Sequence, residues 1–332
     1  HLYYNVRRKL KYKKGQKLFM KKDIGVYVHI PFCKAKCFYC DFVSFANKDE
    51  FMESYVDAVI KEIEASNLGK YNIKTVYIGG GTPSILDSKY IGEILEKLSF
   101  DKEAEITIEI NPGTINENKL KDYIDFGINR ISIGLQSTNN DLLKQIGRIH
   151  TFEEFLEGYN IAKNVGFKNI NVDLMLGLPN QSLEVLENSL DRVISLNPNH
   201  ISIYSLILEE GTRLESLIKQ NKLKMIDEDL EREMYWKTKN ILEKHGYIHY
   251  EISNFAKEGY MSRHNLDCWS QKEYIGFGVA AHSYIESTRY SNICDVEKYI
   301  SNVKEADFEK NRIVQEIQVE EEKRKRIYAT WT

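Results

Sequence analysis

Short apolar runs rich in β-branched residues alternate along this chain with longer amphipathic stretches. Six such runs occur in order and predict strands at residues 26–30, 75–79, 105–110, 130–135, 169–174 and 200–205. The stretches between them carry apolar residues at helical spacing and end near Gly, Asn or Pro, which predicts helices at 51–66, 88–98, 151–165 and 182–196. This alternation is typical of repeated β/α units around a parallel sheet.

Six β/α units in succession predict an α/β protein with a partial (β/α)6 TIM-like barrel, whose chemistry lies at the carboxyl ends of the strands. A doubly wound open sheet is the alternative. After residue 205 the rhythm gives way to a helical pattern at 228–245 and a segment rich in glycine and aromatic residues at 247–290. We therefore predict a disordered leader at 1–19, a barrel core at 20–210, an extension at 211–310 and a charged tail at 311–332.

Composition narrows the class of protein. The chain has 332 residues, of which 42% are hydrophobic, so it can bury a large core, and its net charge of -3 gives no broad basic surface for nucleic acid. No apolar run approaches the ~18–20 residues that cross a bilayer. The basic N-terminal segment lacks the apolar core of a secretory signal, and Met20 opens a stretch that reads like a natural beginning. Five cysteines in this length indicate a reducing cytoplasm.

The densest chemical signal is the run HIPFCKAKCFYCDF. Cys33, Cys37 and Cys40 are spaced C-x3-C-x2-C directly after a predicted strand, so one loop could hold three corners of a cubane iron–sulfur cluster and leave the fourth iron without a protein ligand. Zinc, a disulfide and three unrelated buried thiols are the alternatives. Structural zinc requires four ligands, and His29 is the nearest further candidate. Cys268 and Cys294 stand alone and read as small buried or half-buried side chains.

Residues suited to holding a ligand follow several of the predicted strands. The second strand leads into GGGTPS, where glycines allow backbone to approach a ligand closely, although a tight turn would explain them equally well. Polar side chains at later strand ends could accept or donate hydrogen bonds, and each alone could be a surface group. They are Glu109 and Gln136 at the ends of the third and fourth strands, Arg148 in the later run IGRIH, and Asp173 on the fifth strand.

Together, CKAKCFYC, GGGTP, the Glu109 strand, LQS and DLMLGLP resemble the radical S-adenosylmethionine (radical SAM) superfamily. More closely, the chain resembles the oxygen-independent coproporphyrinogen III oxidase family and its HemW haem-chaperone branch, from about residue 25 to residue 290. The resemblance implies that Cys33, Cys37 and Cys40 ligate a [4Fe-4S] cluster whose open iron is chelated by S-adenosylmethionine. It also implies a set of residues around that cofactor: Tyr27, Gly79, Gly80, Gly81, Thr82, Glu109, Gln136, Arg148 and Asp173.

Two segments distinguish the haem-chaperone branch from the decarboxylating oxidase. The decarboxylating oxidase has a fourth cysteine two residues after the third, where this chain has Phe42, and it has a longer N-terminal segment. RHNLDCW, residues 263–269, resembles the HNxxYW signature of the haem-chaperone branch, which makes His264 a candidate haem ligand. A histidine hydrogen-bonded beneath a loop is the alternative, and His282 is a second candidate. Cys268 stands where the family has tyrosine.

The resemblance therefore implies a haem chaperone that carries a cluster with exchangeable S-adenosylmethionine and passes haem to an acceptor protein. Its partners would be haem or a porphyrin, an unidentified acceptor, and an electron donor such as a flavodoxin or ferredoxin. We expect it in the cytoplasm, peripheral at the membrane when it delivers haem. The alternatives are an anaerobic coproporphyrinogen III oxidase or other radical SAM oxidoreductase, and a remnant without cofactor. Relatives continue into a small helical domain, so we expect a truncated C-terminal extension.

Overall fold

The computed structural model of the chain describes residues 21–315. The predicted leader at 1–19 lies outside the described residues, as does the predicted tail from residue 316 onward. The extension predicted at 211–310 and the first residues of the tail lie within them, and they form part of the same sheet as the core.

The six predicted strands form the parallel centre of the sheet, each next to its successor in the chain. A doubly wound sheet reverses its strand order part-way, so this consecutive order excludes that alternative and confirms the partial barrel. Five of the strands are longer than the sequence predicts because their ends are less apolar than their middles, and the sixth has the predicted bounds 200–205. They are β1 (Lys22–Ile30), β4 (Tyr71–Gly80), β5 (Phe100–Ile110), β6 (Arg130–Gln136), β7 (Asn169–Leu176) and β8 (His200–Ser205).

Strands from the later part of the chain extend both ends of this centre, giving 12 strands in one sheet within residues 21–315. On the β8 side, β10 (Asn254–Ala256) and β9 (Ile248–His249) add antiparallel. On the β1 side, β11 (Tyr274–Phe277) adds parallel, followed by antiparallel β12 (His282–Ile285), β13 (Thr288–Asn292) and β14 (Arg312–Gln315). A small separate sheet pairs β2 (Phe32–Cys33) with β3 (Phe45–Ala46).

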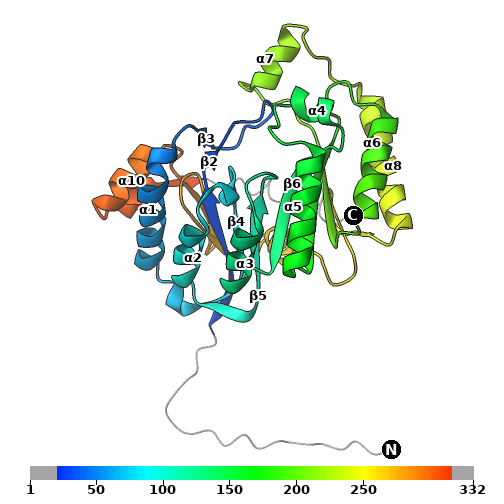
Figure 1. Cartoon of the computed structure of the whole chain (residues 1–332). Helices are drawn as coiled ribbons and strands as arrows, with labels where there is room; N and C mark the ends of the chain where they lie inside the picture. Colours follow the sequence, from blue (N-terminus) through cyan, green and yellow to red (C-terminus); the bar gives the residue numbers. More distant parts are fainter. Residues whose placement is uncertain (1–20, 316–332) are drawn as a thin grey trace, which may run out of the picture.

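Helices cover the outer face of the curved sheet (Figure 1). The predicted helices are present as α1 (Met52–Ala65), α2 (Ser88–Glu96), α5 (Phe152–Val165), α6 (Leu183–Ser195) and α8 (Glu228–Lys244). Local signals fix their ends: Thr151 and Glu154 form a capping box at the start of α5, and Gly166 ends it at φ 113°. Five further α-helices in the described chain were not predicted: α3 (Glu117–Asp125), α4 (Asn140–Gln145), α7 (Arg213–Lys219), α9 (Arg263–Trp269) and α10 (Val296–Lys304).

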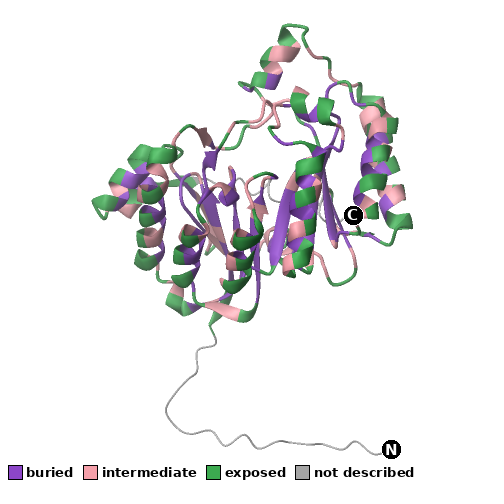
Figure 2. Cartoon of the chain, viewed as in Figure 1, coloured by how far each residue is buried: buried purple, intermediate pink, exposed green. Residues whose placement is uncertain are grey.

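The two faces of the central strands differ in chemistry. Outward residues such as Ile108, Ile131 and Val172 are fully buried under the helices, and Figure 2 shows burial concentrated on these strands. Because side chains alternate along a strand, the residues between them face the concave side, where they are polar, as with Glu109 and Ser132. The sheet therefore presents a polar inner surface with the carboxyl ends of its strands at one rim.

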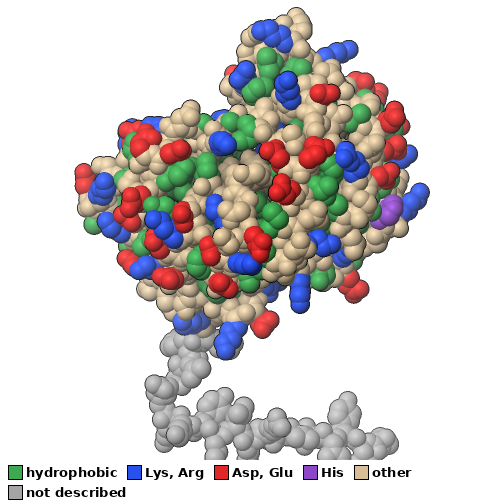
Figure 3. All heavy atoms as spheres, in the orientation of Figure 1, with side chains coloured by type: hydrophobic (Ala, Val, Ile, Leu, Met, Phe, Trp, Pro, Cys, Tyr) green, Lys and Arg blue, Asp and Glu red, His purple; other side chains and the backbone are tan. Residues whose placement is uncertain are grey.

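The surface carries mixed charge. Figure 3 shows acidic and basic side chains interspersed over the visible face, in keeping with the net charge of -3. Among residues 21–315, no helix combines the length and apolar character needed to cross a bilayer.

Candidate cofactor site

The cysteine loop begins where β1 ends and is tied to the rest of the barrel by backbone hydrogen bonds. Phe38 N–H donates to the Ile146 carbonyl (2.9 Å), and the Phe38 carbonyl accepts from Leu214 N–H (2.7 Å). Within the loop, Cys40 N–H donates to the Cys37 carbonyl (3.2 Å), which forms a tight turn between the second and third cysteines. The loop is therefore held at the carboxyl ends of the strands by backbone contacts to two other segments, at Ile146 and at Leu214.

The thiols lie in a partly buried polar environment. Thr82 Oγ1 donates to Cys33 Sγ at 3.5 Å, and Arg148 Nη1 donates to Cys37 Sγ at 3.6 Å. Burial raises the pKa of the Cys33 and Cys40 thiols, and the neighbouring Cys37 raises both further. The Cys33 and Cys40 thiols are therefore protonated near neutral pH, and a bound cation would be needed to stabilise them as thiolates.

Two of the three alternatives to a cluster, a disulfide and a zinc site, find no support in this loop. The cysteines of the described chain are free, so none of them forms a disulfide. No three His, Cys, Asp or Glu side chains in residues 21–315 converge on one metal-ion position. In a cubane cluster each cysteine binds a different iron, so its thiols need not converge on one point. Both nitrogens of His29, the zinc candidate, are engaged, by Tyr27 Oη and the Val43 carbonyl.

The glycines after β4 allow the backbone to lie directly against the first cysteine. A Cβ on Gly81 would lie 2.9 Å from Cys33 Sγ and 2.8 Å from the Phe32 carbonyl oxygen. Gly80 adopts φ 118°, and its N–H donates to Glu109 Oε2 (3.1 Å). Glycine is required at both positions, one for space and one for conformation, and this close approach fits a loop that cradles a ligand beside the thiols.

A cavity of about 540 Å³ opens beside the cysteine loop, over the carboxyl ends of the strands, and we call it the cluster cavity. Of the predicted cofactor residues, Gly81, Thr82, Glu109, Gln136, Arg148 and Asp173 line it, whereas Tyr27, Gly79 and Gly80 do not. The remaining lining residues are Tyr39, Asp41, Phe42, Tyr77, Ile110, Asn111, Ser132, Gly134, Met175, Tyr204, Ser205, Leu206, Ile207 and Glu209.

Arg148 places a half-buried cation between the cluster cavity and the second cysteine. Its Nη2 donates to Asn111 Oδ1 (2.8 Å) and to the Gly134 carbonyl (2.5 Å). Its Nε is buried without a partner among the described residues. A half-buried guanidinium with a spare donor suits a carboxylate ligand, because carboxylates bind arginine through paired N–H donors. This is the chemistry that the methionyl end of S-adenosylmethionine offers.

Two carboxyls form the acidic wall of the cluster cavity. Glu109 Oε1 accepts from Tyr77 Oη (2.9 Å), and burial, with Asp173 nearby, raises the pKa of Glu109 to about 7. Asp173 accepts from Ser132 Oγ (3.0 Å) and Asn171 Nδ2 (2.7 Å), and burial raises the pKa of this carboxyl as well. These groups can accept hydrogen bonds from an amine or a ribose hydroxyl.

A second cavity, of about 460 Å³, lies against helix α9 on the β1 side of the sheet, and we call it the α9 cavity. It contains Tyr27, which the sequence placed beside the cofactor, together with the candidate haem ligands His264 and His282. Its lining residues are Tyr27, His29, Asp41, Phe42, Val43, His264, Cys268, Tyr274, Ala280 and His282. Asp41 and Phe42 line both cavities, so the end of the cysteine loop separates them.

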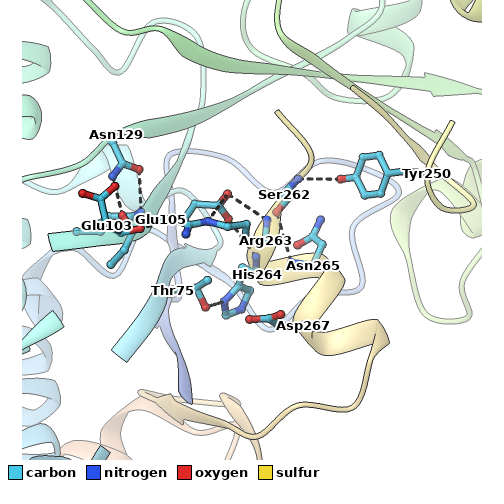
Figure 4. Close-up of polar contacts among 12 residues, drawn as sticks. Thr75, Glu103, Glu105, Asn129, Tyr250, Ser262, Arg263, His264, Asn265 and Asp267 are labelled. Atoms are coloured by element: carbon cyan, nitrogen blue, oxygen red, sulfur yellow. Dashed lines mark hydrogen bonds and ion pairs between the residues drawn. The ribbon is translucent and has the colours of Figure 1, made fainter. Parts of the chain in front are cut away.

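The start of α9 is fastened to the inner face of the sheet, as Figure 4 shows. Both carboxylate oxygens of Glu105 accept backbone N–H groups, one from Arg263 and one from His264, each at 3.0 Å. The His264 ring stacks on Tyr77 with 5.2 Å between centroids, and its Nδ1 shares a hydrogen bond with Thr75 Oγ1 (2.9 Å). Burial, with the charge of a nearby arginine, lowers the pKa of His264 to about 4, so its ring is neutral.

Comparisons with known proteins find relatives that cover most of the chain. Residues 27–193 match the model of the radical SAM superfamily. The Heme chaperone HemW of Bacillus subtilis is 38% identical over 309 residues, covering 90% of this chain and 81% of the relative. The Heme chaperone HemW of Escherichia coli is 39% identical over 270 residues, covering 79% of this chain and 70% of the relative.

The chain belongs to the HemW family of radical SAM proteins. Coproporphyrinogen III oxidase from Escherichia coli, a solved structure, matches it with a TM-score of 0.79 and 24% identity, covering 92% of this chain and 75% of that one. That likeness shows the shared fold. Family membership and the partial barrel are thus confirmed, while the individual roles of the site residues in this HemW chain stay predictions.

Several residues of this HemW site were not foreseen from the sequence. Tyr77 lies two positions before Gly79 and therefore on the same strand face, and Asn111 lies two positions after Glu109, so the period of two along a strand could have found both. Tyr204 is the penultimate residue of β8, two positions after Ser202 on the same strand face, and could have been found in the same way. No local signal marks Asp41 and Phe42, because their position between two cavities arises from the tertiary fold.

Proposed function

We propose that the protein is a haem chaperone, which binds haem and passes it to an acceptor protein while carrying a [4Fe-4S] cluster with exchangeable S-adenosylmethionine. The observation that carries this proposal is the 38% identity to a named Heme chaperone HemW over 90% of the chain. Identity to the coproporphyrinogen III oxidase is 24%, which supports the common fold and no common activity.

The residue after the cysteine motif favours the chaperone over the oxidase. Phe42 occupies the position of the fourth cysteine in the oxidase pattern, and its side chain is 66% exposed at the edge of both cavities. An exposed aromatic ring cannot act as a thiol, but it can pack against a flat apolar ligand. The site therefore has a feature suited to binding haem where the oxidase carries a thiol.

The cofactor assignments are those that the family resemblance implies, and the donor set of the cluster cavity, together with the cysteine loop beside it, is compatible with them. Cys33, Cys37 and Cys40 would hold the cluster, which supplies one iron without a protein ligand when bound. Arg148 would bind the carboxylate of S-adenosylmethionine, and Glu109 and Asp173 would accept its hydroxyl or amine donors. Gly79, Gly80, Gly81, Thr82 and Gln136 complete the proposed set, with Tyr27 behind Tyr77, whose ring it stacks on at 6.2 Å.

We further propose that a flavodoxin or ferredoxin reduces the cluster, and that the protein works in the cytoplasm, reaching a membrane when its acceptor is there. The cysteine usage supports a reducing compartment. His264 stays a proposed haem contact: its Nδ1 is engaged by Thr75, so only its Nε2 is left to meet a ligand in the α9 cavity.

The test is anaerobic reconstitution of the full chain with iron and sulfide, followed by electron paramagnetic resonance with and without S-adenosylmethionine, and by titration with haem. We expect a cluster signal that changes with S-adenosylmethionine and a stoichiometric Soret shift with haem. Incubation with coproporphyrinogen III, a reductant and S-adenosylmethionine should give no decarboxylated product above control. Absence of haem binding by the reconstituted protein would exclude the chaperone function.

A further inference from the structure

An arginine side chain is buried inside the barrel at the amino end of β6. Arg130 opens this strand, is 1% exposed, and is the largest of the fully buried side chains in the described chain. It pairs in register with Thr107 of β5 and Asn169 of β7. Arg130 Nε, Thr107 Oγ1 and Asn169 Oδ1 are all buried without a hydrogen-bond partner among residues 21–315. Hydrogen bonds to its strand neighbours therefore do not explain why the barrel holds this cation.

The two carboxyls of the cluster cavity lie one layer further along the same strand face. Glu109 pairs in register with Ser132, and Asp173 accepts a hydrogen bond from Ser132 Oγ (3.0 Å). Ser132 is two residues after Arg130, about 7 Å along the strand, which an extended arginine side chain can span. The charge of Arg130 lowers the pKa of both carboxyls, against the effect of burial, so both lie within its electrostatic range. A buried charge is costly unless opposite charges compensate it, and these carboxyls supply them.

The other titratable groups around this trio differ in charge from Arg130. Burial, with the charge of Arg130, lowers the pKa of His200 and His264, so both rings are neutral. Arg148 is positive, but it is engaged at the cysteine loop through Cys37 Sγ. Arg130 is therefore the cation on the inner side of the two carboxyls. The groups that surround the trio are Tyr27 of β1, Tyr77 of β4, Glu105 of β5, His200 and Tyr204 of β8, Tyr250, His264 of α9, and Tyr39, Asp41, Arg148 and Glu209 in the cavity lining.

The charge of the proposed cofactor makes the ionisation of these carboxyls important. S-adenosylmethionine carries a sulfonium, an ammonium and one carboxylate, so it is a net cation and is attracted by ionised carboxyls. Arg130 does not line the cluster cavity, so it acts on the ligand through Glu109 and Asp173 and not by contact. A guanidinium suits this task, because it stays charged at every pH at which the protein is folded.

We propose that Arg130 is a positioning residue for the cofactor: as the buried countercharge of Glu109 and Asp173, it keeps these carboxyls ionised for the cationic S-adenosylmethionine. This assignment rests on the proposed function. It gives the amino end of β6 a role in a site at the carboxyl ends of the strands. An arginine that only stabilises the fold would affect binding equally at every pH, whereas a countercharge changes the pH at which the carboxyls ionise.

The first test is infrared difference spectroscopy of the full chain, before and after cluster reconstitution, on the C=O stretch of protonated carboxyls. Between about pH 6 and pH 9 exposed carboxyls are ionised, so this band reports those with a raised pKa, and Glu109→Gln identifies the Glu109 part. We expect its midpoint at about 7 in the wild type and at least about one pH unit higher in Arg130→Met. Arg130→Lys, which keeps the charge, should stay closer to the wild type, and Arg232→Met, at an exposed arginine of α8, should equal it. A wild-type midpoint in Arg130→Met would overturn the assignment.

The second test is anaerobic equilibrium dialysis of the reconstituted proteins with radiolabelled S-adenosylmethionine at pH 6 and pH 8. We expect Arg130→Met to weaken binding at least about tenfold at pH 8, where the wild-type Glu109 is ionised. The loss should be smaller at pH 6, where Glu109 is protonated in both proteins. A loss of equal size at the two pH values would show a purely structural role and overturn the assignment.

Folding is checked by urea unfolding at pH 8, because Arg130→Met leaves two carboxyls without their countercharge. The double variant Arg130→Met with Asp173→Asn removes one charge of each sign, so we expect it to be more stable than Arg130→Met alone, and no gain would overturn the assignment. If the reconstituted wild type binds no S-adenosylmethionine, the proposed function fails, while the infrared midpoints still test Arg130. If it binds S-adenosylmethionine and haem, the cargo of that function, but Arg130→Met titrates like the wild type, only this assignment fails.

Discussion

The two cavities on either side of Asp41 and Phe42 are built in opposite ways. The cluster cavity is formed by the carboxyl ends of successive strands, each contributing one or two polar side chains. The α9 cavity is assembled from β1, the end of the cysteine loop, α9 and the β11–β12 turn, which are far apart in the sequence. One site is therefore fixed by the barrel core, and the other by how the extension packs onto that core.

This difference implies that the cofactor and the cargo respond to different mutations. Changes on the strand ends should affect the cluster and S-adenosylmethionine and leave haem binding intact. Changes that weaken the packing of α9 should affect haem binding and leave the cluster and S-adenosylmethionine binding intact. Substitutions in one cavity therefore test whether binding in the other is independent of it.

The largest expected effect is on the cluster itself. Replacing Cys37 by Ala removes one of three ligands, and we expect cluster iron and sulfide to fall at least about tenfold, because a cubane with two protein ligands is easily lost. Haem affinity should stay within about twofold. Cys294→Ala, at an exposed thiol, is the control and should change neither quantity. A parallel loss of haem binding in Cys37→Ala would show that the cavities are not independent.

The core of the fold was predictable because its strands bury one face. Runs such as that of β6 place Ile131 and Ile133 under the helices, and burial on this scale leaves a clear β-branched pattern. Helix α3 was missed because only Leu120 and Tyr123 are buried on it, and α9 because His264 is its one buried residue. Too few apolar positions remain in either to mark a helical period.

The residues of the candidate site also differ in how far the sequence could predict them. Residues at strand ends, such as Glu109 and Asp173, could be located from the sequence because parallel strands bring their carboxyl ends to one rim. The neighbours of His264 could not, since Thr75 and Glu105 lie more than 150 positions away in the chain. Strand β13 has the polar sequence TRYSN and is specified by its cross-strand pairing, which no local pattern reveals.

A smaller effect is expected at the glycine that touches the first cysteine. Gly81→Ala places a methyl group 2.8 Å from the Phe32 carbonyl oxygen, so backbone must shift, which costs about 3 kcal/mol of unfolding free energy and moves Cys33. Gly69→Ala is the matched control, because nothing lies within 4 Å of its added Cβ. Urea unfolding together with iron content measures both variants. Equal stability of the two variants would contradict the close approach.

The buried carboxyl Glu109 should give the apo protein a pH dependence. Because burial raises its pKa from 4.5 to about 7, the folded chain holds this proton to a higher pH than the unfolded chain. Stability therefore falls as pH rises from about 4.5 to about 7, on the order of 3 kcal/mol across the window, and is level above it. Glu109→Gln should reduce this fall and leave the part that the raised pKa of Asp173 contributes, while Glu117→Gln, on the surface of α3, keeps the whole of it. Urea unfolding at pH 5 and pH 8 measures this effect. An identical change in unfolding free energy between the two pH values in wild type and Glu109→Gln would rule it out.

The smallest effect tests the packing of the extension. Glu105→Gln keeps one acceptor for the backbone N–H groups at the start of α9 and loses the other, together with the negative charge that favours a helix N-terminus. We expect a loss of about 1 kcal/mol in unfolding free energy and a two- to threefold weaker haem affinity, on the order of one broken hydrogen bond. Glu103→Gln, two residues earlier on β5 and exposed, is the control. The electron paramagnetic resonance change on adding S-adenosylmethionine should be the same in all three proteins, because its site depends on the strand ends and not on α9. If Glu105→Gln altered that change as strongly as it altered haem affinity, α9 would have to support both cavities.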